Sequence, residues 1–210
     1  MSEMKDYYES ISPVAESFRA LRTKIKRSFL ENGWKTLLIT AAGPGEGATS
    51  VSLDLARSFQ KNGDKVLLVD ANLRLPALGE QLDARGEGLS DILARGAMPT
   101  ERIVTPTEEP DLLPAGKAPE NPAEMLGSKN MQQLLEALKE QYEIILIDTP
   151  PAAVVADAAI LSAQTDAVLL VVEDGAANKR QVKKAIDAIE QAGGHLIGAV
   201  MNKTSPRDMR

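Results

Sequence analysis

Five short apolar runs constrain the fold of this chain more than any other feature of its sequence. They are nearly continuous rather than alternating: "TLLIT" (36–40), "KVLLVD" (65–70), "EIILIDTPP" (143–151), "AVLLVV" (167–172) and "LIGAVMNK" (196–203). Each has the length of a strand, and continuous apolarity predicts strands buried on both faces. Segments with helical patterns separate the runs, at 128–140, 157–163 and 178–191 among others. The sequence therefore predicts an α/β fold, a doubly wound, mostly parallel sheet with helices on both faces and right-handed crossovers.

A glycine-rich loop, "AAGPGEGATS" (41–50), follows the first apolar run and precedes a helical pattern. A strand, a glycine turn and a helix start together form an anion site, because the first helical N–H groups have no partners. Gly45 and Gly47 would let the backbone approach a phosphate. Thr49 would place its hydroxyl on Mg²⁺, and Ser50 would contact another phosphate oxygen. The alternative is a tight turn that binds nothing.

One residue of this loop departs from the phosphate-binding pattern. The pattern G-x-x-x-x-G-K-[ST] places a lysine before the hydroxyl residue, and this chain has Ala48 there. A hydrogen bond to a charged group contributes about 1.5–3 kcal/mol, so one lost bond to phosphate weakens binding roughly ten- to a hundredfold. Catalysis of phosphoryl transfer suffers more, because it depends on positioning and on charge neutralisation.

Aspartates end two of the predicted strands. Asp70 ends the second run and Asp148 ends the third. Ligands of doubly wound sheets bind outside the carboxyl ends of the strands, so both carboxylates and the glycine loop are expected to converge on one crevice. The alternative for each aspartate is a helix cap or a loop anchor.

The remaining segments are an N-terminal helix and an irregular middle. Val14, Phe18, Leu21, Ile25 and Phe29 follow one another at spacings of three and four, which predicts an amphipathic helix. The middle, 75–127, carries seven of the twelve prolines. It is expected to form short helices at 88–95 and 122–126 around an extended "DLLPA".

Composition limits the classes of function. A length of 210 residues fits one domain, 1–210. The net charge of −6 argues against nucleic acid as a partner. The chain has no cysteine, which fits a reducing cytoplasm, and its single histidine, His195, excludes a histidine-based metal cluster. No apolar run is long enough for a membrane span, so any membrane contact is expected to come through a partner.

Six motifs in order resemble the cytoplasmic catalytic domain of the bacterial tyrosine kinases of capsule and exopolysaccharide synthesis, which are related to the P-loop ATPases of the MinD/ParA type. They are "ESFRALRT" (16–23), "GPGEGATS", "VLLVDANLRLP", "LLPAGKAPENPAEMLGS", "IILIDTPPAAVVADA" and "MNK" (201–203). The match covers nearly the whole chain. The first helix, at about 14–31, corresponds to the one that joins subunits into a ring in the family, so the resemblance implies a homo-oligomer.

The resemblance also assigns roles to individual residues. ATP or ADP would be bound by residues of the loop and two others: Gly43, Gly45, Glu46, Gly47, Ala48, Thr49, Ser50, Arg74 and Asn202. Mg²⁺ would be held by Thr49, Asp70 and Asp148. The catalytic positions are Asp70, Asn72 and Asp148. The subunit interface would use Glu16, Arg19 and Arg22, for which an exposed ion pair of the first helix is the alternative.

Three departures from the family pattern affect activity. Ala48 replaces the loop lysine, and Asn72 replaces the second aspartate of D-x-D-x-R, where an amide cannot act as a base. The tyrosine-rich tail is missing, and the tyrosines present are Tyr7, Tyr8 and Tyr142. A naturally divergent pseudokinase explains the set more simply than a single designed substitution, with a deliberately altered or shortened sequence as the alternative.

The sequence thus predicts a regulatory member of the family with impaired chemistry. It would be cytoplasmic and would dock on the cytoplasmic end of a membrane chain-length regulator, at the inner face of the membrane, to assist polysaccharide polymerisation or export. The competing hypothesis is a working kinase or ATPase in which Arg74, or a neighbour's arginine, replaces the lysine. A ParA/MinD-type partitioning ATPase ranks lowest, because that group has an additional loop lysine where this chain has Gly43.

Overall fold

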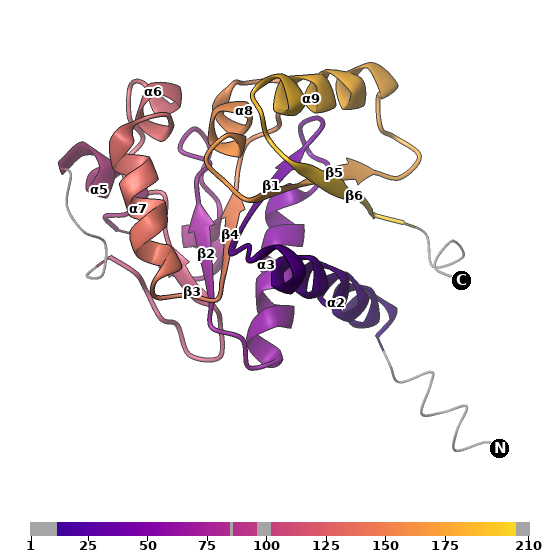
Figure 1. Cartoon of the computed structure of the whole chain (residues 1–210), viewed down its shortest axis with the longest axis horizontal. Coiled ribbons are helices and arrows are strands. Elements are labelled where there is room, and N and C mark those ends of the chain that lie inside the picture. Colours follow the sequence, from indigo (N-terminus) through magenta and orange to yellow (C-terminus); the bar gives the residue numbers. More distant parts are fainter. Residues whose placement is uncertain (1–11, 85, 96–101, 205–210) are drawn as a thin grey trace.

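The computed structural model describes residues 12–84, 86–95 and 102–204. Within this part of the chain a six-stranded parallel sheet has the order β3-β2-β4-β1-β5-β6 (Figure 1). Its strands are β1 (Thr36–Ala41), β2 (Val66–Asp70), β3 (Asp111–Leu113), β4 (Ile144–Asp148), β5 (Ala167–Glu173) and β6 (Leu196–Asn202). The predicted doubly wound parallel sheet is confirmed.

Helices cover both faces of the sheet. They are α2 (Pro13–Asn32), α3 (Ala48–Lys61), α4 (Leu78–Gln81), α5 (Leu89–Arg95), α6 (Pro122–Leu126), α7 (Lys129–Lys139), α8 (Asp157–Ser162) and α9 (Lys179–Gln191). Helices α2, α3 and α4 pack on one face, and α5 to α9 pack on the other (Figure 1). The short helix α4 was not expected from the sequence.

The core consists of two apolar layers separated by the sheet. Successive residues of a strand point to opposite faces, so Leu38 joins the layer beneath α7, α8 and α9, whereas Leu37 joins the layer beneath α2 and α3. Both side chains are fully buried. The central strands therefore need apolar residues at every position, which is why their runs in the sequence are continuous.

Strand β6 corrects one expectation. The run 196–203 is as apolar as the others, but the strand is not buried on both faces, and Met201 is 55% exposed. The physical reason is its place at the edge of the sheet, where β5 is its one neighbour in the described structure. At the opposite edge the extended segment of the middle region forms β3, and an isolated antiparallel bridge joins Val104 to Leu112.

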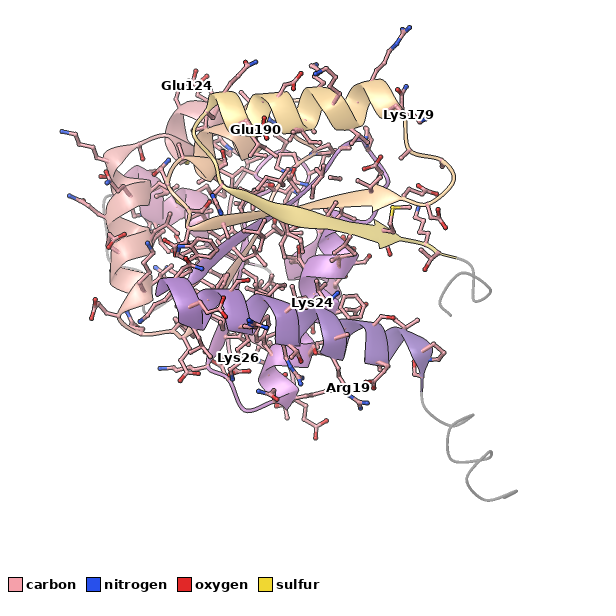
Figure 2. All side chains as sticks on the ribbon, turned by 45° about the vertical axis from the view of Figure 1, so that its right-hand side comes forward. Arg19, Lys24, Lys26, Glu124, Lys179 and Glu190 are labelled. Atoms are coloured by element: carbon pink, nitrogen blue, oxygen red, sulfur yellow. The ribbon has the colours of Figure 1, made fainter. Side chains whose placement is uncertain are left out.

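The apolar side of helix α2 is exposed near the start of the helix and buried near its end. Ser12 caps its first turn, Pro13 occupies the first position, and Gly33 ends it with a φ of 69°. Of the predicted apolar stripe, Ile25 and Phe29 are buried, whereas Val14 is 51% exposed. Charged side chains such as Arg19 and Lys24 are exposed along the helix, whereas the Lys26 ammonium pairs with Asp64, just after α3 (Figure 2). Among the described residues, no helix is both long and apolar enough to cross a membrane.

Candidate functional site

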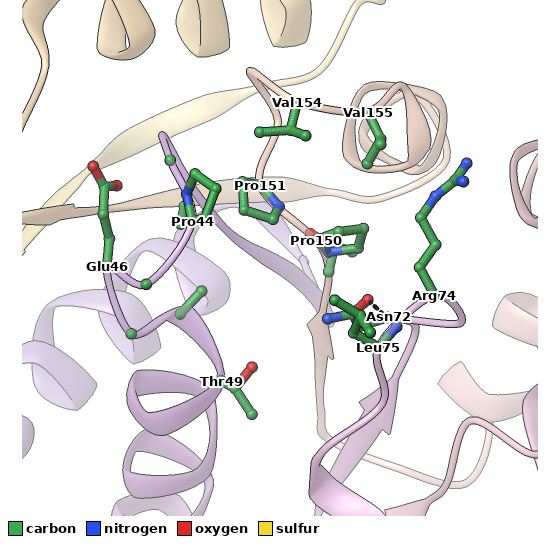
Figure 3. Close-up of a pocket in the computed structure, with 16 residues that line it drawn as sticks. Pro44, Glu46, Thr49, Asn72, Arg74, Leu75, Pro150, Pro151, Val154 and Val155 are labelled. Atoms are coloured by element: carbon green, nitrogen blue, oxygen red, sulfur yellow. Dashed lines mark hydrogen bonds between the residues drawn. The ribbon is translucent and has the colours of Figure 1, made fainter.

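A cavity of about 390 Å³ opens at the carboxyl edge of the sheet (Figure 3). Loops that follow three neighbouring strands, β1, β2 and β4, enclose it. Its lining residues are Ala41, Gly43, Pro44, Gly45, Glu46, Gly47, Ala48, Thr49, Asn72, Arg74, Leu75, Thr149, Pro150, Pro151, Val154 and Val155. The glycine loop and the segment after Asp70 therefore meet where the sequence placed them, and the volume suits a small ligand.

The glycine loop has the geometry of an anion site. Gly45 and Gly47 adopt positive φ angles of 80° and 91°, which side-chain-bearing residues rarely adopt. Gly47 is the N-cap of α3 and no side chain caps this helix end in the structure as described. The first N–H groups of α3 thus remain available to a ligand at the loop. This arrangement fits a nucleotide phosphate.

Two residues expected to bind nucleotide make hydrogen bonds that support the glycine loop. A carboxylate oxygen of Glu46 accepts a hydrogen bond from the Ala42 N–H at 2.9 Å, and Glu46 is buried. The side-chain amide of Asn202 donates to the Glu46 carbonyl at 2.8 Å, and Asn202 does not line the cavity. Lys203 adds a third support, since its ammonium donates to the Gly45 carbonyl at 2.8 Å.

Arg74 is the one cation among the described residues that line the cavity. Its guanidinium makes a two-pronged ion pair with Asp157, at 2.8 and 2.9 Å, and the Asp157 side chain is fully buried. Arg74 lies across the cavity from Pro44 and Glu46, and its guanidinium points away from the glycine loop (Figure 3). At the lysine position of the pattern, Ala48 presents only a methyl group.

Asp148 lies beneath the loop and binds its helix. One carboxylate oxygen accepts from the Thr49 hydroxyl at 2.7 Å, and the other accepts from the Ser52 hydroxyl at 3.0 Å. Asp70 is the register partner of Asp148 on the adjacent strand β2. The parallel register thus places two buried carboxylates side by side, as the sequence predicted from their positions at two strand ends.

Both carboxylates have perturbed acidities. Burial raises the pKa of Asp148 from 3.8 to about 7, and the charge of Asp70 adds to this, whereas hydrogen bonds from Thr49 and Ser52 oppose it. Burial likewise raises the pKa of Asp70 to about 6, against hydrogen bonds from the backbone at Leu78, Asn72 and Ala77. Desolvated carboxylates that lack a cation are electrostatically suited to receive one.

Asn72 shapes the turn that follows β2. Its backbone N–H donates to Asp70 at 3.2 Å, and its side-chain oxygen accepts from the Leu75 N–H at 3.2 Å. Within the described residues no group of three or more His, Cys, Asp or Glu side chains is arranged for a metal ion. The oxygen donors of Thr49 and Asp148 nevertheless fit Mg²⁺ when phosphate oxygens supply further ligands.

Other predicted residues lie elsewhere. Ser50 is exposed and does not line the cavity. On α2, the Arg19 guanidinium pairs with Glu16 at 2.7 Å, and both side chains are more than half exposed. Arg22 turns inward, where its guanidinium donates to the Ser58 carbonyl at 2.7 Å.

Two residues of the site were missed by sequence reasoning. Ser52 lies one helical turn after Ala48, and its hydroxyl also donates to the Ala48 carbonyl at 2.9 Å. Asp157 begins α8, where an acidic residue is common as a favourable partner of the helix dipole. No local signal distinguished either residue from an ordinary helix residue, because their partners are distant in the sequence.

The chain is similar to several known proteins. Residues 34–196 match a family described as an AAA domain. Tyrosine-protein kinase YwqD of Bacillus subtilis (strain 168) is 36% identical over 190 residues, covering 90% of this chain and 80% of YwqD. The kinase domain of Escherichia coli tyrosine kinase ETK has a TM-score of 0.85 at 34% identity, covering 91% of this chain and 77% of its own.

A more distant likeness shows the fold alone. Cobyrinic acid a,c-diamide synthase from Mycobacterium smegmatis, with bound ATP analogue and magnesium, has a TM-score of 0.70 at 19% identity. The likeness covers 84% of this chain and 77% of the synthase chain. The six-stranded parallel sheet with its glycine loop is thus the P-loop NTPase fold.

Proposed function

The chain belongs to the family of bacterial tyrosine-protein kinases, and from this premise we propose that it is a divergent, regulatory member with weak nucleotide binding and without efficient kinase activity. The observation that carries the proposal is that, among the described residues, no cationic side chain at the cavity is free of a carboxylate partner. Ala48 stands at the lysine position, and the Arg74 guanidinium is engaged by Asp157. Phosphoryl transfer depends on neutralising charge at the transferred group, and among the described residues the cavity has no unpaired cationic side chain that would do this beside a bound Mg²⁺.

Nucleotide binding itself has a basis in the remaining residues. The N–H groups at the start of α3 would hold phosphate oxygens, and Thr49 and Asp148 would hold Mg²⁺. When bound, Mg²⁺ would neutralise charge on the phosphates. Asp70 lies beside Asp148 on the adjacent strand, and both Asp70 and Asn72 accept backbone hydrogen bonds that organise the turn after β2. We therefore assign them positioning roles in binding, without a general base at Asn72.

The biological setting follows from the family resemblance. We propose that the chain acts at the inner face of the cell membrane through a membrane chain-length regulator and assists capsule or exopolysaccharide synthesis and export. Self-assembly would use the outer side of α2, where the Glu16–Arg19 pair is exposed (Figure 2). Arg22 would contribute indirectly, because its guanidinium holds α2 against α3.

Calorimetric titration with ATP and ADP in Mg²⁺ tests the proposal. We expect weak binding to the wild type and roughly ten- to a hundredfold tighter ATP binding to Ala48→Lys, the size of one charge-assisted hydrogen bond. Ser58→Ala, on the same helix but remote from the cavity, serves as the control. Wild-type binding that is already tight and unaffected by Ala48→Lys would contradict the proposal.

A working kinase or ATPase is the second candidate, because Arg74 does line the cavity. This candidate requires either that Arg74 leaves Asp157 or that a neighbouring subunit supplies an arginine. A kinase, unlike an ATPase that transfers the phosphoryl group to water, also requires a tyrosine as acceptor. Tyr142 is unsuited, since it is buried, its hydroxyl donates to Asp111 at 2.8 Å, and burial raises its pKa. Tyr7 and Tyr8 lie outside the described residues. Phosphate release that requires both Mg²⁺ and Asp148 would favour this candidate.

A further inference from the structure

The ion pair with Asp157 fixes the position of the Arg74 guanidinium in the cavity. The guanidinium Nε and one terminal nitrogen contact both oxygens of the Asp157 carboxylate, at 2.8 and 2.9 Å. The Asp157 side chain is fully buried, whereas that of Arg74 is 39% exposed. If Arg74 left, a carboxylate would remain buried without its partner, which is unfavourable. The pair therefore holds Arg74 at the α8 side of the cavity, away from the glycine loop (Figure 3).

Two lysines near the cavity do not replace Arg74 as a cation for a bound phosphate. The Lys184 ammonium donates to the Ala153 carbonyl at 2.6 Å, and that of Lys203 donates to the Gly45 carbonyl at 2.8 Å and to Glu173. Neither side chain lines the cavity. Within the described structure, both cationic contacts available to a third phosphate are thus withdrawn, one by Ala48 and one by Asp157.

The contacts to the α and β phosphates do not depend on the missing lysine. In phosphate-binding loops the backbone N–H groups cradle the α and β phosphates, whereas the lysine reaches the β and γ phosphates. The glycine loop and the start of α3 retain the backbone geometry for the former. The backbone contacts to the α and β phosphates are therefore retained, whereas the cationic contact to the γ phosphate is lost.

We propose that this site selects a nucleoside diphosphate over the triphosphate, and that Asp157 sets the selectivity by holding Arg74 away from the third phosphate. This inference rests on the proposed nucleotide binding and deepens it. A site that prefers ADP would make the protein respond to the concentration of ADP rather than use ATP as a substrate. Asp157 acts through Arg74, so it is a positioning residue.

The test is calorimetric measurement of the dissociation constants for Mg²⁺–ADP and Mg²⁺–ATP on the full chain. The wild type is expected to bind ADP at least as tightly as ATP. Asp157→Asn, which removes the charge that holds Arg74, is expected to tighten ATP binding about tenfold while changing ADP binding little. Adding Arg74→Gln to that variant should abolish the gain.

The outcomes distinguish failure of the diphosphate selectivity from failure of nucleotide binding itself. ATP bound tenfold more tightly than ADP by the wild type would overturn the selectivity but leave nucleotide binding intact. Binding of neither nucleotide would overturn both. Unchanged ATP affinity in folded Asp157→Asn would remove the role of Asp157. If that variant does not fold, Arg74→Gln alone decides, because an arginine held away predicts unchanged ATP affinity, and a tenfold loss would overturn the proposal.

Discussion

Two aspartates at opposite ends of the sheet, Asp166 and Asp148, have opposite electrostatic environments. At the amino edge, Asp166 accepts hydrogen bonds from the N–H groups of Lys35 and Thr36 and from the Thr36 hydroxyl, at 2.8–2.9 Å. The Lys139 ammonium lies 3.3 Å away. At the carboxyl edge, Asp148 accepts from two hydroxyls and has Asp70, a second carboxylate, as its register partner.

Their acidities show the difference. Burial alone would raise the pKa of Asp166, but the hydrogen bonds from Lys35 and Thr36 and the charge of Lys139 outweigh it, so that pKa is lowered. The pKa of Asp148 is raised to about 7. The comparison teaches that a carboxylate satisfied by amides and a cation serves stability, whereas one left short of positive charge is suited to binding a cation.

The largest loss of stability expected from a single substitution is at the amino edge of the sheet. Asp166→Ala would leave the N–H groups of Lys35 and Thr36 without their acceptor, and we expect it to lower the free energy of unfolding by about 3 kcal/mol. Asp148→Asn at neutral pH should instead raise the free energy of unfolding, because it removes a desolvated charge. Urea denaturation measures both, and equal losses would contradict the comparison.

The second effect is the pH dependence of stability. Because the pKa values of Asp148 and Asp70 rise from 3.8 to about 7 and about 6 on folding, the folded state holds more protons than the unfolded state within this range. The free energy of unfolding should therefore fall as pH rises from about 4 to 7, by as much as about 1.4 kcal/mol per unit of pKa difference.

Asp148→Asn is the matched variant for this dependence. It should flatten the fall between about pH 4 and 7, leaving the part due to Asp70. Asp166 contributes in the opposite sense, since its lowered pKa adds stability that is lost as the pH falls through the folded value. Denaturant titrations at several pH values test this, and a wild-type stability that rises through this window would refute the assignment.

The third effect concerns magnesium. A cation at Asp148 must displace the proton that the raised pKa retains, so Mg²⁺–ADP affinity should increase with pH up to about 7, by at most tenfold per unit. Calorimetry in buffers of different ionisation enthalpy would detect the released proton. Asp148→Asn should abolish the release, and a pH-independent affinity would mean that Asp148 does not serve the cation.

The smallest effect is expected at Ser52. Ser52→Ala removes one donor to Asp148 and should cost about 1 kcal/mol of stability. It should also raise the pKa of Asp148 further, which moves the pH dependence of Mg²⁺–ADP binding toward higher pH. Ser58→Ala, on the same helix but remote from Asp148, is the control. A cost in stability without a shift in the pH profile would make Ser52 purely structural.

The central sheet and the loop were predictable because their signals are local. Continuous apolar runs indicated the buried strands, and the glycines indicated the turn before α3. The same logic was wrong for β6, since apolarity does not distinguish an edge strand from a central one. The pairing of Asp70 with Asp148 followed from the rule that ligand-binding residues collect at the carboxyl edge of parallel strands.

By itself, the sequence determined the alternation of strands and helices, the loop without its lysine, and the two carboxylates at strand ends. Only the tertiary structure decided that Arg74 is engaged by Asp157, that Glu46 and Asn202 support the loop, and that Ser52 holds Asp148. The physical reason is the range of the interactions. Strand and turn propensities depend on neighbouring residues, whereas the partner of a charged side chain is set by which elements the packed sheet brings within hydrogen-bond distance.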